Sequence, residues 1–262
     1  MIRWLTRRSG NSETLLPKTN SERFERKFYL PESIIPFAAH LLAHCCPQDR
    51  QYPRGTIYSV YYDTPDLEYF NDSQEGNYGR VKVRVRWYDS PPADSESTTV
   101  FLEVKSKRGY AGSKQRKSFA IPSERLGDSA LSQGVLPYPA VMHGLAELGY
   151  CPPNLLQPLI VISYRRLRFV ERMTGSRVSL DWDIRSTRIS QGAGRREGTI
   201  RMEGGVIENK GQSPEIPTTL QSIRELGTDW SRYSKYASCV EAHLEEPGSV
   251  GRIWPSGRTE SA

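Results

Sequence analysis

Basic residues occupy every second position in one stretch of this chain. From Arg80 to Trp87 the order is Arg-Val-Lys-Val-Arg-Val-Arg-Trp, which places the cations on one parity and the apolar residues on the other. Successive side chains of a β-strand point to opposite faces, so the segment predicts a strand with a basic face and a packing face. A ladder of like charges on one face favours an anionic partner.

The charge of the chain is concentrated around this ladder. Residues 80–117 hold ten basic and four acidic residues, a net of +6, and the whole chain of 262 residues also carries +6, from 36 basic and 30 acidic residues. The remainder is therefore neutral in sum, and the anionic partner should meet residues 80–117.

Carboxylates share the parity of the cations in several other alternating segments. Two cations about 6 Å apart repel by roughly 3 kcal/mol at an effective dielectric near 20, so a closed basic face needs an anion or inward carboxylates. Carboxylate oxygens also ligate divalent metals that bridge phosphates, which favours a polyphosphate chain with a metal. The alternative is a sheet with one face in the core and the other in water. The carboxylates on the cationic parity are Glu25, Glu103, Asp181, Asp183 and Glu208.

Motifs of other phosphate and metal chemistries are absent from the sequence. No G-x-x-x-x-G-K-[ST] loop and no protein-kinase motif set occurs. His40 and His44 are spaced i,i+4 on an expected helix, but Leu41 stands where a zinc protease has Glu, so helix packing is the preferred interpretation. Trp87 lies on the packing parity, whereas stacking of RNA bases needs aromatics on the cationic face, so nucleic acid is not an expected partner.

Segments of period two, several of them separated by turn-forming clusters, set the expected fold. They predict one mainly β (α+β) domain at residues 22–245, with eight antiparallel strands and flanking helices. The polar ends, 1–21 and 246–262, are expected to be loose. Helical periodicity covers 33–45, 131–148, 217–226 and 231–244. The expected strands are 23–30, 56–62, 80–88, 100–106, 114–121, 159–170, 177–184 and 199–210.

Membrane and secretion signals are not evident. No apolar run approaches the roughly 20 residues that span a bilayer, and the first ten residues carry three arginines without the apolar core of a secretion signal. The four cysteines lack paired metal spacing. These features predict a reduced, cytoplasmic protein without a transmembrane segment.

An ordered series of short motifs resembles a known family. RFERK (23–27), YYDTP (61–65), RVRWY (84–88) and LEVK (102–105) are followed by YRR (164–166), RVSLD (177–181), VIENK (206–210) and SKY (234–236). Over residues 22–240 the series is similar to the VTC domain (vacuolar transporter chaperone), a polyphosphate polymerase within the CYTH-like superfamily of triphosphate tunnel metalloenzymes. The resemblance implies an eight-stranded tunnel that holds a nucleotide triphosphate and growing polyphosphate. It also implies a divalent metal, Mn²⁺ in preference to Mg²⁺.

The same resemblance assigns roles to individual residues. Glu208 falls on the metal-binding carboxylate, and Arg23 stands where the superfamily has the first of two glutamates. Lys114 and Lys117 remain alternatives to Arg116, because the register of their strand is open. The residues expected to act on phosphate are Lys27, Arg84, Arg86, Lys105, Arg116, Arg166, Arg177 and Lys235, with Lys82, Lys114, Tyr164 and Ser234 as further substrate contacts.

Polyphosphate synthesis from ATP is the function that these features favour. The terminal phosphoryl group of ATP would pass to a growing polyphosphate chain inside the cationic tunnel, mainly through positioning and electrostatics. The expected partners are ATP or another triphosphate, and polyphosphate. Two alternatives stay open: an inorganic or nucleoside triphosphatase that uses the same site on water, and a non-catalytic module that binds polyphosphate.

Overall fold

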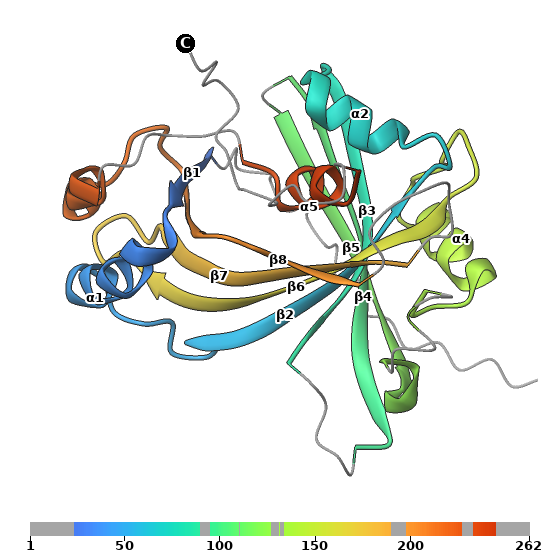
Figure 1. Ribbon diagram of the computed structural model, residues 1–262, viewed down its shortest axis with the longest axis horizontal. Coiled ribbons are helices and arrows are strands. Elements are labelled where there is room, and N and C mark those ends of the chain that lie inside the picture. Colours follow the sequence, from blue (N-terminus) through green and yellow to red (C-terminus); the bar gives the residue numbers. More distant parts are fainter. Residues whose placement is uncertain are drawn as a thin grey trace, which may run out of the picture.

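The architecture is one antiparallel sheet that bends around a short helix (Figure 1). The computed structural model describes residues 24–89, 95–109, 111–126, 131, 134–189, 198–226 and 233–244, so both expected loose ends lie outside the described residues. The strands are β1 (Phe24–Leu30), β2 (Arg54–Asp63), β3 (Gly79–Tyr88), β4 (Ser97–Arg108), β5 (Ala111–Pro122), β6 (Gln157–Val170), β7 (Arg177–Arg188), β8 (Thr199–Met202) and β9 (Gly205–Gly211).

The strand order is β1-β9-β7-β6-β2-β3-β4-β5, and β8 pairs with β7 outside this path. The predicted antiparallel β fold is confirmed, with two differences. The sheet does not close, because β1 and β5 share no backbone pairing in the described part of the chain. The expected eighth strand is two strands, divided at Gly204, whose φ of +84° favours glycine and where a Cβ would meet the carbonyl oxygen of Leu30 at 2.5 Å.

A β-bulge in β7 reverses one predicted orientation. Ser163 of β6 pairs with Arg185 of β7 while Arg165 pairs with Trp182, so β7 holds one residue more than β6 between these pairs. The extra step turns Asp183, which has a φ of +49°, away from the face that carries Asp181. The prediction that Asp183 lies inward is therefore wrong. It pairs on the outside with the exposed side chains of Arg165, Arg185 and Arg201.

The helices match the predicted positions in part. They are α1 (Ile35–Cys45), α2 (Glu68–Glu75), α4 (Tyr138–Glu147) and α5 (Lys235–Leu244), with a long 3₁₀ helix, η3 (Thr218–Leu226), where an α-helix was expected. The helix predicted at 131–148 is interrupted: Leu131 is helical, Gly134 has a φ of +78°, and α4 begins after Pro137. Helix α2 was not predicted. None of the described helices is long and apolar enough to cross a membrane.

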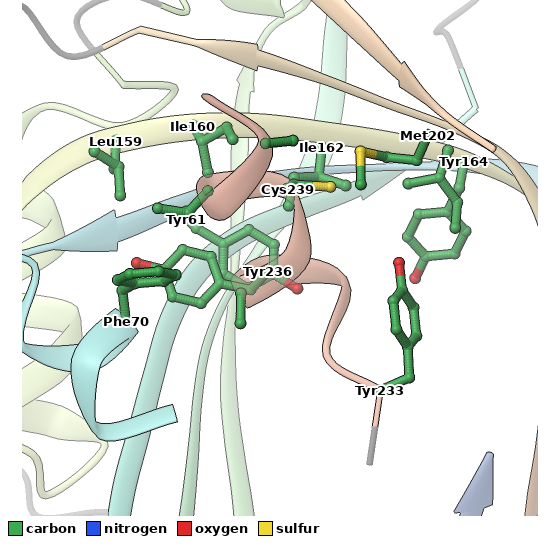
Figure 2. Packing of buried hydrophobic residues seen from close by; sticks show 14 of the residues in the cluster. Tyr61, Phe70, Leu159, Ile160, Ile162, Tyr164, Met202, Tyr233, Tyr236 and Cys239 are labelled. Carbon is green, nitrogen blue, oxygen red and sulfur yellow. The ribbon is translucent and has the colours of Figure 1, made fainter. Parts of the chain in front are cut away.

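Three apolar clusters hold the sheet and its helices together. On the outer side, α4 packs on β3 and β4 through Leu145, Val85 and Leu102. Helix α1 and η3 cover β1, β7 and β9 through Leu42 and Leu220. Helix α5 lies on the concave side, where Tyr236 and Cys239 pack among residues such as Tyr61, Ile162 and Met202 (Figure 2). The concave face is therefore partly filled by α5, and the rest of it is free for polar side chains.

Candidate functional site

The polar side chains of the strands converge on the concave face next to α5. The basic residues outnumber the carboxylates, ten to four, so the set carries an excess of positive charge. We call this set the cationic face. Its basic residues are Lys27, Lys82, Arg84, Arg86, Lys105, Lys114, Arg116, Arg166, Lys210 and Lys235, and its carboxylates are Glu25, Glu103, Asp181 and Glu208.

Two buried carboxylates anchor one part of the face. The ammonium group of Lys235, at the start of α5, lies 2.6 Å from Asp181 Oδ2 and 2.9 Å from Glu208 Oε1. The guanidinium of Arg166 binds both oxygens of Asp181 and donates to Glu208 Oε2 at 3.2 Å. Lys210 lies 3.1 Å from the same Glu208 oxygen. The α5 lysine is thus fixed to the sheet by charge.

A second group forms around Glu103 of β4. The side chain of Glu103 is 1% exposed and accepts from Arg84 Nε at 2.8 Å, while Lys114 of β5 lies 2.6 Å away. Arg84 also donates to the hydroxyl of Tyr61 at 2.9 Å. Arg84 and Lys114 are therefore held on adjacent strands by one shared carboxylate.

Arg86 is the most buried cation of β3, at 7% exposed. Its Nε donates to Ser59 Oγ at 3.0 Å and its Nη2 to the hydroxyl of Tyr164 at 3.3 Å. It is in no ion pair with a described residue. Its charge is oriented by neutral groups and remains available to an anion.

Lysines bridge the unpaired gap between β1 and the strands opposite it. Lys105 of β4 donates to Glu25 of β1 at 2.9 Å, and Lys27 donates to the carbonyl oxygen of Tyr233 at 2.8 Å. Lys82 of β3 donates to Ser234 Oγ at 2.7 Å, just before α5. Side chains of the cationic face thus connect β1, β3 and β4, which share no backbone ladder across the gap.

Asp63 holds α5 in place from the end of β2. It is fully buried, and its oxygens accept from the backbone N–H groups of Tyr69 and Phe70 of α2 and from the hydroxyl of Tyr236. The Tyr236 ring stacks on Tyr61 with centroids 4.8 Å apart. Through these contacts α2, β2 and α5 orient the cations of β3 and α5.

The charges of the face alter its own protonation equilibria. Burial would raise the pKa of Glu103, but positive neighbours, chiefly Arg84, outweigh burial and lower that pKa to about 2. Burial lowers the pKa of Lys114 to about 8, although Glu103 opposes the change. Burial, followed by the charge of Lys27, lowers the pKa of Lys82 well below its usual value. By contrast, neighbouring carboxylates raise the pKa of Lys210, and they outweigh burial to raise the pKa of Lys235. The charged forms of Lys82 and Lys114 are therefore disfavoured, a cost that a bound anion would relieve.

Most of the predicted phosphate residues belong to this face, and the open choice on β5 is resolved. Lys114 and Arg116 both face inward, and Arg116 lies 4.7 Å from the ring centroid of Phe101. Lys117 faces outward and pairs with Glu147 of α4. Arg177 lies opposite Lys210 in the β7–β9 pairing, at the exposed end of β7, and is in no ion pair with a described residue, so its predicted role stays a prediction. The predicted residues that the structure brings together are Lys27, Lys82, Arg84, Arg86, Lys105, Lys114, Arg116, Tyr164, Arg166, Glu208, Ser234 and Lys235.

Several members of the site had not been assigned to it. Lys210 lies two residues after Glu208 on β9, and Tyr61 lies two residues before Asp63 on β2. Residues two apart on a strand share a face, so the alternation could have indicated that Lys210 and Tyr61 belong to the site. Asp63 and Tyr236 act across the fold, and no local pattern signals their contact. Arg23 lies outside the described residues.

The donor set around Glu208 decides what kind of metal it could hold. Burial would raise the pKa of Glu208, but Lys210, followed by other cations, lowers it well below its usual range. Both carboxylate oxygens are already in ion pairs, and the described residues hold no group of three or more metal-binding side chains. One carboxylate can still serve a hard cation whose remaining ligands are phosphate oxygens and water. The residues therefore fit a metal that arrives with a phosphate ligand.

Comparisons with known proteins supply a family. The family model of the VTC domain matches residues 22–244. No curated protein matches the sequence. Among solved structures, a candidate adenylate cyclase from Bacillus halodurans is similar over 81% of this chain and 95% of its own, with 16% identity and a TM-score of 0.48. A candidate adenylyl cyclase from Hippeastrum, described as having a dominant triphosphatase activity, shares 19% identity over 84% of this chain and 96% of its own, with a TM-score of 0.43.

Proposed function

Because this chain belongs to the VTC domain family, we propose that it is a triphosphate-binding enzyme that synthesises polyphosphate. It transfers the terminal phosphoryl group of ATP to a growing polyphosphate chain on the cationic face. In this reaction the bond between the β–γ bridging oxygen and the terminal phosphorus breaks. A terminal oxygen of the polyphosphate forms the new bond, and ADP leaves.

The observation that supports this proposal is the excess of oriented cations. Lys82 and Arg86 are in no ion pair with a described residue, and both are hydrogen-bonded to hydroxyl groups that fix their direction. A solvated surface tolerates like charges at no great cost, whereas Arg86 and its neighbour Glu103 are almost fully buried. The buried cations Arg86 and Lys235 are matched by buried carboxylates, so the excess charge lies with the partly exposed cations of the same face, where an anion can reach them. A chain of phosphates provides several negative charges at regular spacing.

The residues of the face would divide the chemical work. Arg84, Arg86 and Arg166 bind and orient the phosphates, since their guanidinium groups offer forked donors. Lys235 places an ammonium group from α5 against the same ligand. These positive charges stabilise the charge that develops on the transferred group. Glu208 would hold a divalent metal, Mn²⁺ or Mg²⁺, together with phosphate oxygens, and the bound ion would supply further neutralisation.

Product analysis tests the proposal. The purified protein is incubated with ATP and Mn²⁺ or Mg²⁺, and phosphate, ADP and polyphosphate are separated. Polyphosphate that accumulates in step with ADP supports a polymerase. Free phosphate without polyphosphate identifies a triphosphatase, and the absence of turnover together with tight polyphosphate binding identifies a binding module. Either of the last two results contradicts the proposed polymerase.

A further inference from the structure

Two aromatic rings lie on the cationic face without serving any apolar core. Tyr88 and Phe101 are on the inward parity of β3 and β4, and neither belongs to the three core clusters. Their ring centroids are 5.9 Å apart, with an interplanar angle of 65°. Trp87, the neighbour of Tyr88, faces the opposite way and packs in the outer core. Aromatic side chains therefore do share the face with the cations.

An arginine completes this group. The guanidinium carbon of Arg116 lies 4.7 Å from the centroid of Phe101, in stacking range. Phe101 thus contacts both Tyr88 and Arg116 and supports them from one side. Arg116 is exposed and in no ion pair with a described residue, so its outer surface is open. The Tyr88 ring and the Arg116 guanidinium both contact the Phe101 ring, and we call these three side chains the platform.

The platform lies at one end of the phosphate-binding cations. Phe101 is directly opposite Arg86 in the β3–β4 pairing, and Tyr88 is two residues beyond Arg86 on the same face. Exposure rises from 7% at Arg86 to 40% at Tyr88 over this short distance. At the other end of β3, Lys82 is covered by Ser234 and the Tyr236 ring. On the neighbouring strands at that end, the side chains of Lys105 and Lys114 are 43% and 44% exposed, so both ends of the cationic face reach solvent, one lined by lysines and the other by aromatic rings.

We propose that Tyr88 and Arg116, supported by Phe101, bind the nucleobase of a nucleoside triphosphate whose phosphates lie inward on the cationic face. This inference rests on the proposed function and adds the residues that hold the base of the substrate and the direction in which the substrate lies. Nucleobases stack on aromatic rings and on guanidinium planes. The arrangement also directs the substrate: the base lies outward, and the terminal phosphate points towards Lys235 and α5. Arg116 then contacts the base, not the phosphates.

Two probes separate this inference from the proposed function. Inorganic tripolyphosphate and ATP are titrated by calorimetry, without metal, into the wild type and three variants, Tyr88→Leu, Arg116→Gln and Phe101→Leu. The matched control is Tyr138→Leu, because Tyr138 is 44% exposed on α4, on the other side of the sheet. We expect Tyr88→Leu to weaken ATP binding by about fivefold or more, since base stacking corresponds to roughly that loss at least. Tripolyphosphate binding should change less than about twofold.

The remaining outcomes are equally decisive. A parallel loss of ATP and tripolyphosphate in Arg116→Gln would show that Arg116 binds phosphate and would overturn its assignment. Equal ATP affinity in the wild type, Tyr88→Leu and Phe101→Leu would show that the platform does not bind the base and would overturn this inference. Tripolyphosphate binding, and with it the proposed function, would remain intact. If the wild type binds neither probe, the proposed function fails and this inference falls with it.

Discussion

Lys114 gives the cationic face a pH dependence near neutrality. Its pKa is about 8, so it carries a full charge below that pH and loses it above. We therefore expect the affinity for tripolyphosphate to fall by roughly two- to tenfold between pH 7 and pH 9, as one charged hydrogen bond is lost. Calorimetric titrations at the two pH values measure the change.

Lys114→Arg is the control for this prediction. The guanidinium group stays protonated over the whole range, so the fall in affinity should become smaller in this variant. Lys82, whose pKa is also lowered by burial, is unchanged in both proteins and contributes equally. An identical pH dependence in both proteins would mean that Lys114 does not contact the ligand.

Glu208→Gln tests the proposed metal position. The amide keeps the shape but removes the charge that draws a divalent cation, so the Mn²⁺ concentration for half-maximal activity should rise and turnover should collapse. Binding of tripolyphosphate without metal should persist or tighten, because a negative charge leaves a site shared by Lys235 and Lys210. Asp183→Asn is the matched control on the outer side. An unchanged Mn²⁺ requirement in Glu208→Gln would remove Glu208 from the metal site.

Parity alone predicted much of the site at the level of residues. The alternation in β3 placed Lys82, Arg84 and Arg86 on one face because an unbroken strand keeps its period of two. It failed at Asp183, where a bulge adds a residue and reverses the parity. A bulge depends on how two strands pair, which one strand's sequence does not display.

At the level of elements, β3 has opposite requirements on its two faces. Val85 is fully buried among Leu102 and other apolar residues, so Val85→Asp would bury a charge without a partner and should abolish folding, at a cost of several kcal/mol. Arg86→Ala removes no apolar core contact but leaves the buried hydroxyls of Ser59 and Tyr164 with one donor fewer, so it should fold with a free energy of unfolding lower by about 1–3 kcal/mol. Circular dichroism measures both. A well-folded Val85→Asp with an unfolded Arg86→Ala would mean that the faces are reversed.

Helix α5 depends on one hydroxyl for its position. The Tyr236 hydroxyl donates to Asp63, whose other hydrogen bonds within the described part of the chain come from backbone N–H groups. Tyr236→Phe keeps the ring stacked on Tyr61 but leaves the buried carboxylate with one donor fewer. We expect a loss of about 1–3 kcal/mol in the free energy of unfolding, measured in urea. Tyr78→Phe, at a ring that is 75% exposed, is the control. Equal stability of the two variants would contradict the role of this hydrogen bond.

Elements with strong periodicity were predicted well, and those defined by tertiary contact were not. Most strands were located to within a few residues, since their alternation is long. Helix α2 has eight mostly polar residues and is held by Asp63 at its start, so its sequence carries little signal. The division of the last strand depends on Gly204, whose close approach to Leu30 becomes visible only in the folded chain.

At the scale of the molecule, the sheet uses side chains where a closed barrel would use backbone pairing. Lys105 and Glu25 connect β4 to β1, and α5 occupies part of the concave side (Figure 1). The family resemblance implied a closed tunnel, and the alternating strands gave no sign of which edges stay unpaired. The consequence is a face whose two ends differ, one with the lysines Lys105 and Lys114 and the other with the aromatic ring of Tyr88.

The central claim is that the concave face, and no other basic surface, binds the triphosphate. The most direct test is calorimetric titration of tripolyphosphate into the wild type, Arg86→Ala and Arg165→Ala, two variants with the same change of charge on opposite faces. Arg86→Ala should weaken binding about tenfold or more, as expected for a charged hydrogen bond in a buried site. Arg165→Ala, at a side chain that is 64% exposed, should change it less than about twofold. Equal losses in the two variants, or a larger loss in Arg165→Ala, would contradict the account.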